Sequence, residues 1–136
     1  MEIVAAVLCD FASVREGLLI VVGGGVTRLW REQLPAPLGI HLAAMLECTR
    51  DELARPHEIQ VWVRTEDGDE IAHVRGGFAL QEVGDLDPGE TTMVPIPLSL
   101  VPVGVNAYGR YSVHLQVDDN LHKTLSLRVA ARPPVV

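Results

Sequence analysis

The sequence predicts an all-β fold, a two-sheet antiparallel β-sandwich with at most one short helix near residues 49–55. Three observations lead to this prediction. Val, Leu and Ile recur in short runs, Gly, Pro and Asp separate these runs, and several runs alternate apolar with polar residues. A period of two is the pattern of a half-buried strand, and regularly spaced short strands are typical of a sandwich or a barrel.

The chain has the length of one domain, residues 1–136, and 48% of its residues are hydrophobic, which is enough for a core without metals or disulfides. The expected strands are Ile3–Phe11, Leu18–Gly23, Val26–Arg31, Leu38–Cys48, Glu58–Thr65, Glu70–Gln81, Thr92–Leu100, Arg110–Asp118 and Leu121–Ala130. The second and third of these are either two strands or one strand bent between them.

The run Gly23-Gly24-Gly25 indicates a β-bulge or a corner of the sheet. A phosphate-binding loop would lead into a helix, often with a Lys, whereas Val26 and its successors have the pattern of a strand. Close backbone approach at a self-association surface is the remaining alternative.

The segment Thr49–Arg55 is the expected helix. Thr49 and Glu52 have the spacing of a capping box, and Pro56 ends the turn.

A hairpin is expected around Asp67-Gly68, which we interpret as a two-residue type I′ turn. This loop length places apolar residues opposite apolar residues. The resulting pairs are Val63 with Ala72 and Val61 with Val74 on the inner face, and Trp62 with His73 and Gln60 with Arg75 on the outer face.

Pro95 and Pro97 predict that the strand containing them lies at the edge of a sheet. Residues two apart direct their N–H groups to the same neighbour, and Pro has no N–H, so this side cannot carry a full ladder. We interpret it as an edge protected against aggregation, in preference to an edge that docks a partner.

A second hairpin joins the last two strands. Their inner residues share one core only if the loop has odd length, which predicts the three residues Asp118-Asp119-Asn120 with Asn120 left-handed. The inner residues are Tyr111, Val113, Leu115, Val117, Leu121, Leu125, Leu127 and Val129. The outer residues are Ser112, His114, Gln116, His122, Thr124 and Ser126, and Lys123 does not fit the alternation.

The net charge of −7 argues against nucleic acid and anionic membranes as partners, because the basic residues are scattered singly along the chain. No apolar stretch reaches the roughly 18 residues of a membrane span, and residues 3–9 have the pattern of a buried strand rather than a signal peptide. We therefore expect a soluble, cytoplasmic protein. Cys9 and Cys48 are expected to be buried, reduced thiols without a catalytic role.

No metal or cofactor is expected. His114 and His122 lie on one face of the second hairpin, but zinc needs three or four ligands. Acidic pairs occur in three turns, and they would bind Ca²⁺ only if the turns gathered at one end of the fold. These pairs are Asp67 and Asp69, Asp85 and Asp87, and Asp118 and Asp119.

The stretches Arg15–Arg28, His57–Val63 with Glu66-Asp67-Gly68, and Gly109–Asp118 resemble a family of short, uncharacterised bacterial proteins. That family has an aromatic residue after the glycines, where this chain has Val26. The second half also resembles immunoglobulin-like modules. The resemblance implies an immunoglobulin-like β-sandwich without an assigned activity, so it transfers no functional residues.

We expect a non-catalytic protein-interaction or structural module that binds a protein partner or itself. Its predicted contact surface is the outer face around Trp62, and exposed Trp residues often mark interfaces. This surface comprises Trp62, His73, Gln60, Arg75 and Arg64. The alternative for Trp62 is that a second layer or the stems of the Arg residues cover the indole.

Two other functions remain open. The first is a ligand-binding sandwich for carbohydrate or Ca²⁺. The second is a small hydrolase, although the sequence has no G-x-S-x-G elbow and no catalytic residue stands out.

Overall fold

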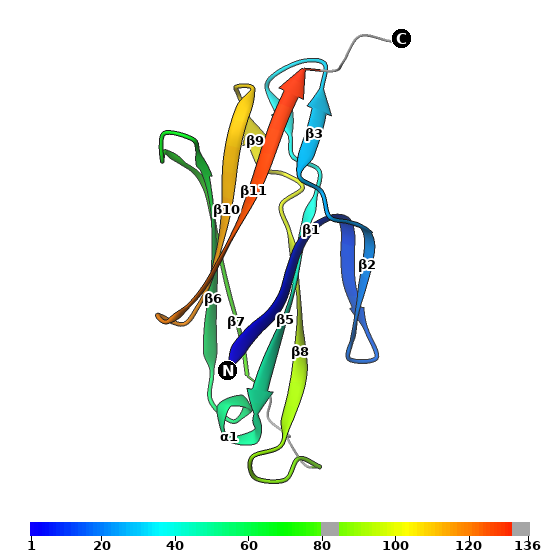
Figure 1. Cartoon of the computed structure of the whole chain (residues 1–136), viewed down its shortest axis with the longest axis vertical. Helices are drawn as coiled ribbons and strands as arrows, with labels where there is room; N and C mark the ends of the chain where they lie inside the picture. The colour runs from blue at the N-terminus through cyan, green and yellow to red at the C-terminus, as the bar shows by residue number, and fades with distance from the viewer. Residues whose placement is uncertain (80–84, 132–136) are drawn as a thin grey trace.

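The computed structural model describes residues 1–79 and 85–131 (Figure 1). The expected all-β fold is confirmed. In chain order the elements are β1 (Glu2–Arg15), β2 (Leu18–Gly24), β3 (Arg28–Arg31), β4 (Ala36–Pro37), β5 (His41–Thr49), α1 (Arg50–Leu53), β6 (His57–Thr65), β7 (Glu70–Phe78), β8 (Thr91–Ser99), β9 (Gly104–Val105), β10 (Gly109–Val117) and β11 (Leu121–Ala131). Gln81, the expected end of one strand, lies outside the described residues.

The strands form two main sheets. The first sheet has the order β2-β1-β5-β8, the second has the order β3-β11-β10-β6-β7, and β4 pairs with β9 separately. All pairs are antiparallel except β3 with β11, which is parallel. The prediction of purely antiparallel sheets is therefore wrong, because the chain crosses to the second sheet after β2 and reaches its edge in the same direction as β11.

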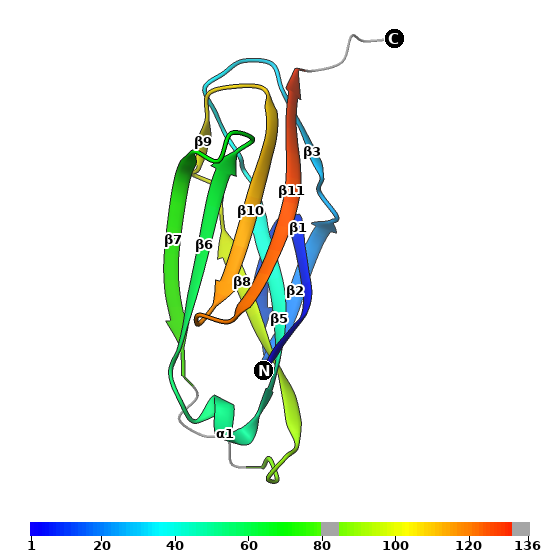
Figure 2. The same ribbon diagram turned by 60° about the vertical axis from the view of Figure 1, so that its left-hand side comes forward.

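One hydrophobic core lies between the two sheets. Leu42 and Leu46 come from β5 of the first sheet, whereas Val61 of β6 and Leu115 of β10 come from the second, and all are at most 1% exposed. In Figure 2, β7, β6, β10 and β11 lie side by side with β5 and β8 behind them. The residues that alternation assigned to the inner face are those that fill this core.

The β6–β7 hairpin has the expected pairs but not the expected turn. Val63 faces Ala72 and Trp62 faces His73, as predicted. The N–H of Thr65, however, donates to the carbonyl of Asp69 at 2.8 Å, so the loop has three residues, and only Gly68 has a positive φ, of 91°. By itself, one more loop residue would turn the side chains of β7 to the opposite face of the sheet. A β-bulge, seen as a register shift between Val63 and Arg64, compensates for it, so the predicted pairs beyond the bulge are kept.

The β10–β11 hairpin has the predicted three-residue loop, because Val117 pairs with Leu121. The left-handed residue is Asp118, with φ of 52°, and not Asn120. The carboxylate of Asp118 accepts hydrogen bonds from the His57 ring and the Glu58 N–H, which holds the backbone in this conformation. Sequence pattern alone does not reveal these partners.

Two further predictions are confirmed. β8, which contains Pro95 and Pro97, is the outermost strand of the first sheet. The short helix α1 has Thr49 as its N-cap, and Glu52 completes the capping box.

β1 pairs with β5 as far as Cys9 and then continues to Arg15 paired only with β2. Its second half bends away, so the β1–β2 hairpin stands beside the body of the protein (Figure 1). At the bend, the N–H groups of Gly25 and Val26 both donate to the carbonyl of Leu8, each at 2.9 Å. Two residues facing one is the pattern of a bulge, so the expected role of the glycine run is confirmed.

We expect Gly23→Ala to lower the free energy of unfolding by about 2 kcal/mol. Gly23 has a φ of 64°, which costs an L-residue about 1 kcal/mol, and an added Cβ would lie 2.4 Å from the Asp10 carboxylate. In urea unfolding, Asp10→Ala should recover part of the loss in the Gly23→Ala background. It should recover none in the Gly25→Ala background, because beyond the chain neighbours no described atom lies within 4 Å of a Cβ added there. Equal recovery in both backgrounds would contradict the proposed clash.

Candidate functional site

The outer face of the second sheet carries a row of aromatic and imidazole rings. Trp62 of β6 is the Cα partner of His73 on β7 and of His114 on β10, so the three side chains share one face. His122 of β11 contacts His114, with ring centroids 5.2 Å apart. We call His73, Trp62, His114 and His122 the aromatic–histidine row.

Trp62 is half-buried on this face and is not part of the core. Its ring stacks on His73, with centroids 4.7 Å apart and planes 9° apart. The guanidinium of Arg64 lies 5.2 Å from the indole centroid. The predicted outward orientation is therefore correct, although Arg64 partly covers the indole, as the alternative interpretation required.

The remaining predicted site residues adjoin Trp62. The side-chain carbonyl of Gln60 accepts hydrogen bonds from His73 Nε2 at 2.9 Å and from Arg75 Nε at 3.3 Å. The structure thus places the five predicted residues on one surface. Gln60 fixes the positions of His73 and Arg75 relative to the indole.

His114 and His122 form a direct contact, with 3.0 Å between Nε2 and Nδ1. His114 Nδ1 lies 2.8 Å from the hydroxyl of Thr124. Burial, with smaller contributions from His122 and Arg64, lowers the pKa of His114, so this ring is neutral at pH 7. Within residues 1–79 and 85–131, no group of three His, Cys, Asp or Glu side chains has the arrangement of a metal site.

A second row, of arginines, crosses the same face. Arg28 on β3 is the Cα partner of Arg128 on β11, which is in turn the partner of Arg110 on β10. All three side chains are exposed, and none forms an ion pair with another described residue. Like charges directly opposite each other destabilise a sheet, so folding does not explain this arginine row.

Trp30 extends this surface. It pairs with Ala130 of β11, is 44% exposed, and has the guanidinium of Arg28 5.5 Å from its ring centroid. Sequence reasoning assigned no face to Trp30 and found no basic stripe. The arginines are scattered in sequence because they come from three strands. The β10–β11 hairpin aligns Arg110 with Arg128, and the parallel β3–β11 pairing adds Arg28.

His57 is a buried residue that sequence reasoning did not identify as special. Its Nδ1 lies 2.7 Å from the Asp118 carboxylate, and its Nε2 contacts the carbonyl of Glu52. Both partners are protein oxygens, so each ring nitrogen is occupied by a contact within the protein. The sequence could have indicated that His57 is buried, because it lies two positions before Ile59 and therefore continues the inward-facing series of Ile59 and Val61.

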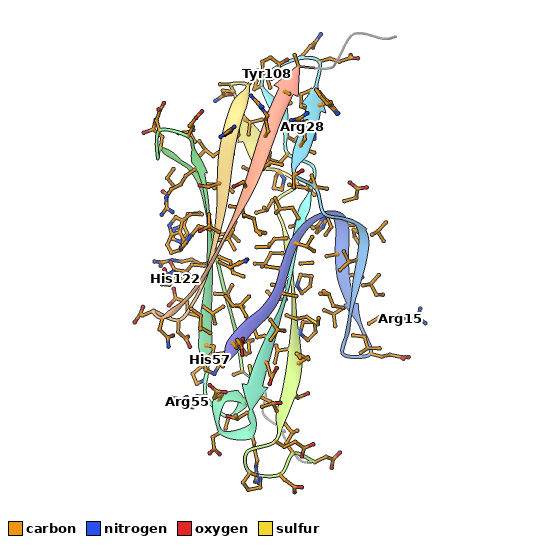
Figure 3. All side chains as sticks on the ribbon, viewed as in Figure 1. Arg15, Arg28, Arg55, His57, Tyr108 and His122 are labelled. Carbon is orange, nitrogen blue, oxygen red and sulfur yellow. The ribbon has the colours of Figure 1, made fainter. Side chains whose placement is uncertain are left out.

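An open cleft of about 630 Å³ lies beside His57, between α1 and the β10–β11 loop. Figure 3 shows His57 and Arg55 at this end of the molecule, with His122 on the outward side of the second sheet. The cleft is lined by Met1, Glu52, Arg55, Pro56, His57, Asp118, Asp119, Asn120 and Leu121. Both nitrogens of His57 contact protein oxygens at the wall of this cleft.

Charged groups in the cleft pair with each other. The α-amino group of Met1 binds the carboxylate of Glu52 and lowers the pKa of that carboxyl to about 2. Burial raises the pKa of Asp118, but hydrogen bonds from His57 and the Glu58 N–H outweigh it, and the pKa is lowered overall. These contacts stabilise the fold.

The acidic turns do not gather as a calcium site would require. Asp118 contacts Glu58 at the start of β6, whereas Asp67 follows Thr65 at the end of the same strand. The two turns are therefore at opposite ends of β6. Cys9 and Cys48 are buried as expected, and burial raises the pKa of both thiols.

The fold and this surface define an all-β protein that gathers Trp, His and Arg side chains on the outer face of one sheet. Residues 4–130 match the family of unknown function DUF6941, and the chain belongs to that family. This agrees with the uncharacterised family that the sequence resembles. No curated protein matches the chain. In the described part of the chain, no helix has the length and hydrophobicity to cross a membrane.

Proposed function

We propose that this protein is a non-catalytic protein-interaction module built on an immunoglobulin-like β-sandwich. The shared core of the two sheets supports the sandwich arrangement. The hydroxyl of Tyr111, near the start of β10, donates to the carbonyl of Ala107 at 2.6 Å. This contact corresponds to the tyrosine corner of immunoglobulin-like domains, in which a Tyr binds the backbone a few residues upstream.

The contact surface is the outer face of the second sheet, comprising the aromatic–histidine row and the arginine row. The observation that carries the proposal is that Trp30, Trp62 and the exposed arginines of the arginine row share this face. Trp and Arg are the residues most enriched at the energetic centres of protein interfaces. An arginine row that destabilises the free sheet becomes favourable once a partner neutralises it.

The partner is a protein surface rich in carboxylates. The chain has a net charge of −7, yet this face carries Arg28, Arg64, Arg75, Arg110 and Arg128. Among carboxylates on the same face, Glu58 lies 4.0 Å from Arg75 in an exposed pair. A positive face on an acidic protein selects an acidic partner and repels like-charged surfaces. Carbohydrate stacking is less favoured, because His73 and Arg64 already contact the indole.

We expect Trp62→Asp to abolish partner binding while leaving the fold intact, because Trp62 is at the centre of the surface and outside the core. A photo-reactive amino acid at Thr124, beside His114 and one strand further from Trp62, should cross-link one acidic protein in cells that naturally produce this protein. In the Trp62→Asp background this adduct should disappear. Trp62→Phe, which keeps a ring, should retain part of it.

The control position is Met93 on β8, on the other sheet, where the same photo-reactive residue should not give this adduct. Adducts with nucleic acid instead of protein, or no adduct above the Met93 control, would overturn the proposal. Circular dichroism of Trp62→Asp completes the test, because an unfolded variant would place Trp62 among the residues that hold the fold.

A further inference from the structure

The strand β2 is an apolar sheet edge that no described residue covers. It is the outermost strand of the first sheet, and its partner on the inner side is β1. Its sequence, LLIVVGG, has no charged residue and no Pro. Exposure is 71% for Leu18, 38% for Ile20, 40% for Val21 and 53% for Val22. Such an edge is a template for pairing with another strand.

The other edges of the two main sheets are protected. β8 contains Pro95 and Pro97, which remove ladder donors. β7 presents charged residues at its exposed positions, including Arg75, and β3 has only four residues, two of them Arg. β2 is thus the one main-sheet edge within residues 1–79 and 85–131 that has neither proline nor charge along it.

The backbone of β2 is ready for pairing. Arg15 pairs with Leu18 across the two-residue turn Glu16-Gly17, whose φ values of 53° and 75° are those of a type I′ turn. In an antiparallel pair, alternate residues direct their N–H and C=O groups away from the partner. In a hairpin of this type Leu18 and Ile20 bond to β1, so Leu19 and Val21 present theirs at the open edge.

We infer that β2 pairs antiparallel with β2 of a second copy of this chain, forming a two-fold dimer with Val21 opposite Val21 of the second copy. In this register Leu18 faces Gly24, Leu19 faces Gly23 and Ile20 faces Val22, so each leucine meets a glycine and the two β-branched side chains meet each other. Because the strand carries no charge, pairing it with itself opposes no like charges. A different protein would have to supply an equally apolar strand, whereas a second copy always does.

The pairing closes as a dimer and does not extend into a fibre. A two-fold contact uses the same edge on both copies. The far edge of each first sheet is then β8, which its prolines protect. The dimer surface is on the first sheet, so this inference does not depend on the function proposed for the outer face of the second sheet.

The test is the mass of the full chain in solution, measured by light scattering across a concentration series. The wild-type protein should have twice the mass of one chain, and Val21→Lys should have the mass of one chain, because it places two ammonium groups opposite each other. Met93→Lys is the matched control, since Met93 is 47% exposed on the opposite edge of the same sheet, and it should remain dimeric. Trp62→Asp should also remain dimeric.

A cysteine variant tests the register and does not depend on how well Val21→Lys folds. Under mild oxidation Val21→Cys should form a disulfide between copies, because paired residues across a ladder have Cα atoms about 5.5 Å apart, within disulfide range. Met93→Cys should not form one, and the buried Cys9 and Cys48 do not compete. A monomeric wild-type protein, a dimer that survives Val21→Lys, or equal cross-linking of the two variants would overturn the inference. The inference would also be overturned if the protein were a monomer whose β2 paired with a strand of a different protein.

Discussion

Asp118→Ala should lower the free energy of unfolding by about 3 kcal/mol. The His57 side chain is 4% exposed and donates to Asp118, so removing the carboxylate leaves a buried donor without its partner. That loss is about 2 kcal/mol here, below the value for a fully buried pair, because the Asp118 side chain is 34% exposed. Alanine at a φ of 52° adds about 1 kcal/mol of backbone strain. Chemical denaturation measures the sum.

Other substitutions separate these contributions. Asp118→Gly removes the carboxylate without the strain and should cost about 1 kcal/mol less than Asp118→Ala. Asp119→Ala changes the neighbouring exposed carboxylate and should stay within about 0.5 kcal/mol of wild type. If Asp118→Ala and Asp119→Ala behaved alike, the His57–Asp118 contact would have no part in stability.

The contribution of Asp118 should also depend on pH. Its pKa is lower in the folded protein than the unfolded value of about 3.9, so the carboxylate stabilises the fold above that pH. This stabilisation is lost as the pH falls below 3.9 through the folded pKa. The difference in stability between wild type and Asp118→Asn should therefore narrow in acid, and a constant difference would contradict a stabilising role for the ionised carboxylate.

Leu115→Ala should cost about 3–4 kcal/mol. Leu115 is 1% exposed, lies two residues before the end of β10, and belongs to the core that residues of both sheets form. Truncating such a side chain removes its transfer free energy and leaves a cavity. Thermal or urea unfolding measures the loss, which should appear as one cooperative transition because the two sheets share the core.

Lys123 provides a matched control. Lys123 lies on β11 as the Cα partner of Leu115, so the strand alternation assigns both residues to the same face of the sheet. The Lys123 side chain is nevertheless exposed. Lys123→Ala should change stability by less than about 0.5 kcal/mol. A large loss at Lys123 together with a small one at Leu115 would mean that the core lies elsewhere.

Alternation was enough to predict much of the fold. The pairing of Val63 with Ala72 and of Val117 with Leu121 follows from matching apolar faces, and each register is unique because a shift by one residue would invert every side chain. The proline edge and the capping box were equally local signals. The placement of Trp62 beside His73 followed from the same registers.

Other features depend on contacts between distant segments, and local patterns do not encode them. Asp118 is left-handed because residues about sixty positions away bind its carboxylate. The arginine row requires the pairing of β3 with β11, and no turn connects those strands. The three-residue loop at Glu66–Gly68 was missed because a bulge near Arg64 compensates for it, leaving the register beyond it unchanged.

The parallel pair of β3 and β11 has a consequence for synthesis of the protein. It joins residues 28–31 to residues 128–131, so its two strands lie 100 positions apart in a chain of 136 residues. At a translation rate of about 5–20 residues per second, β3 is synthesised several seconds before β11, its neighbour in the sheet. Nascent chains that end before residue 128 lack the partner strand of β3. The β3–β11 ladder therefore forms only after β11 has left the ribosome.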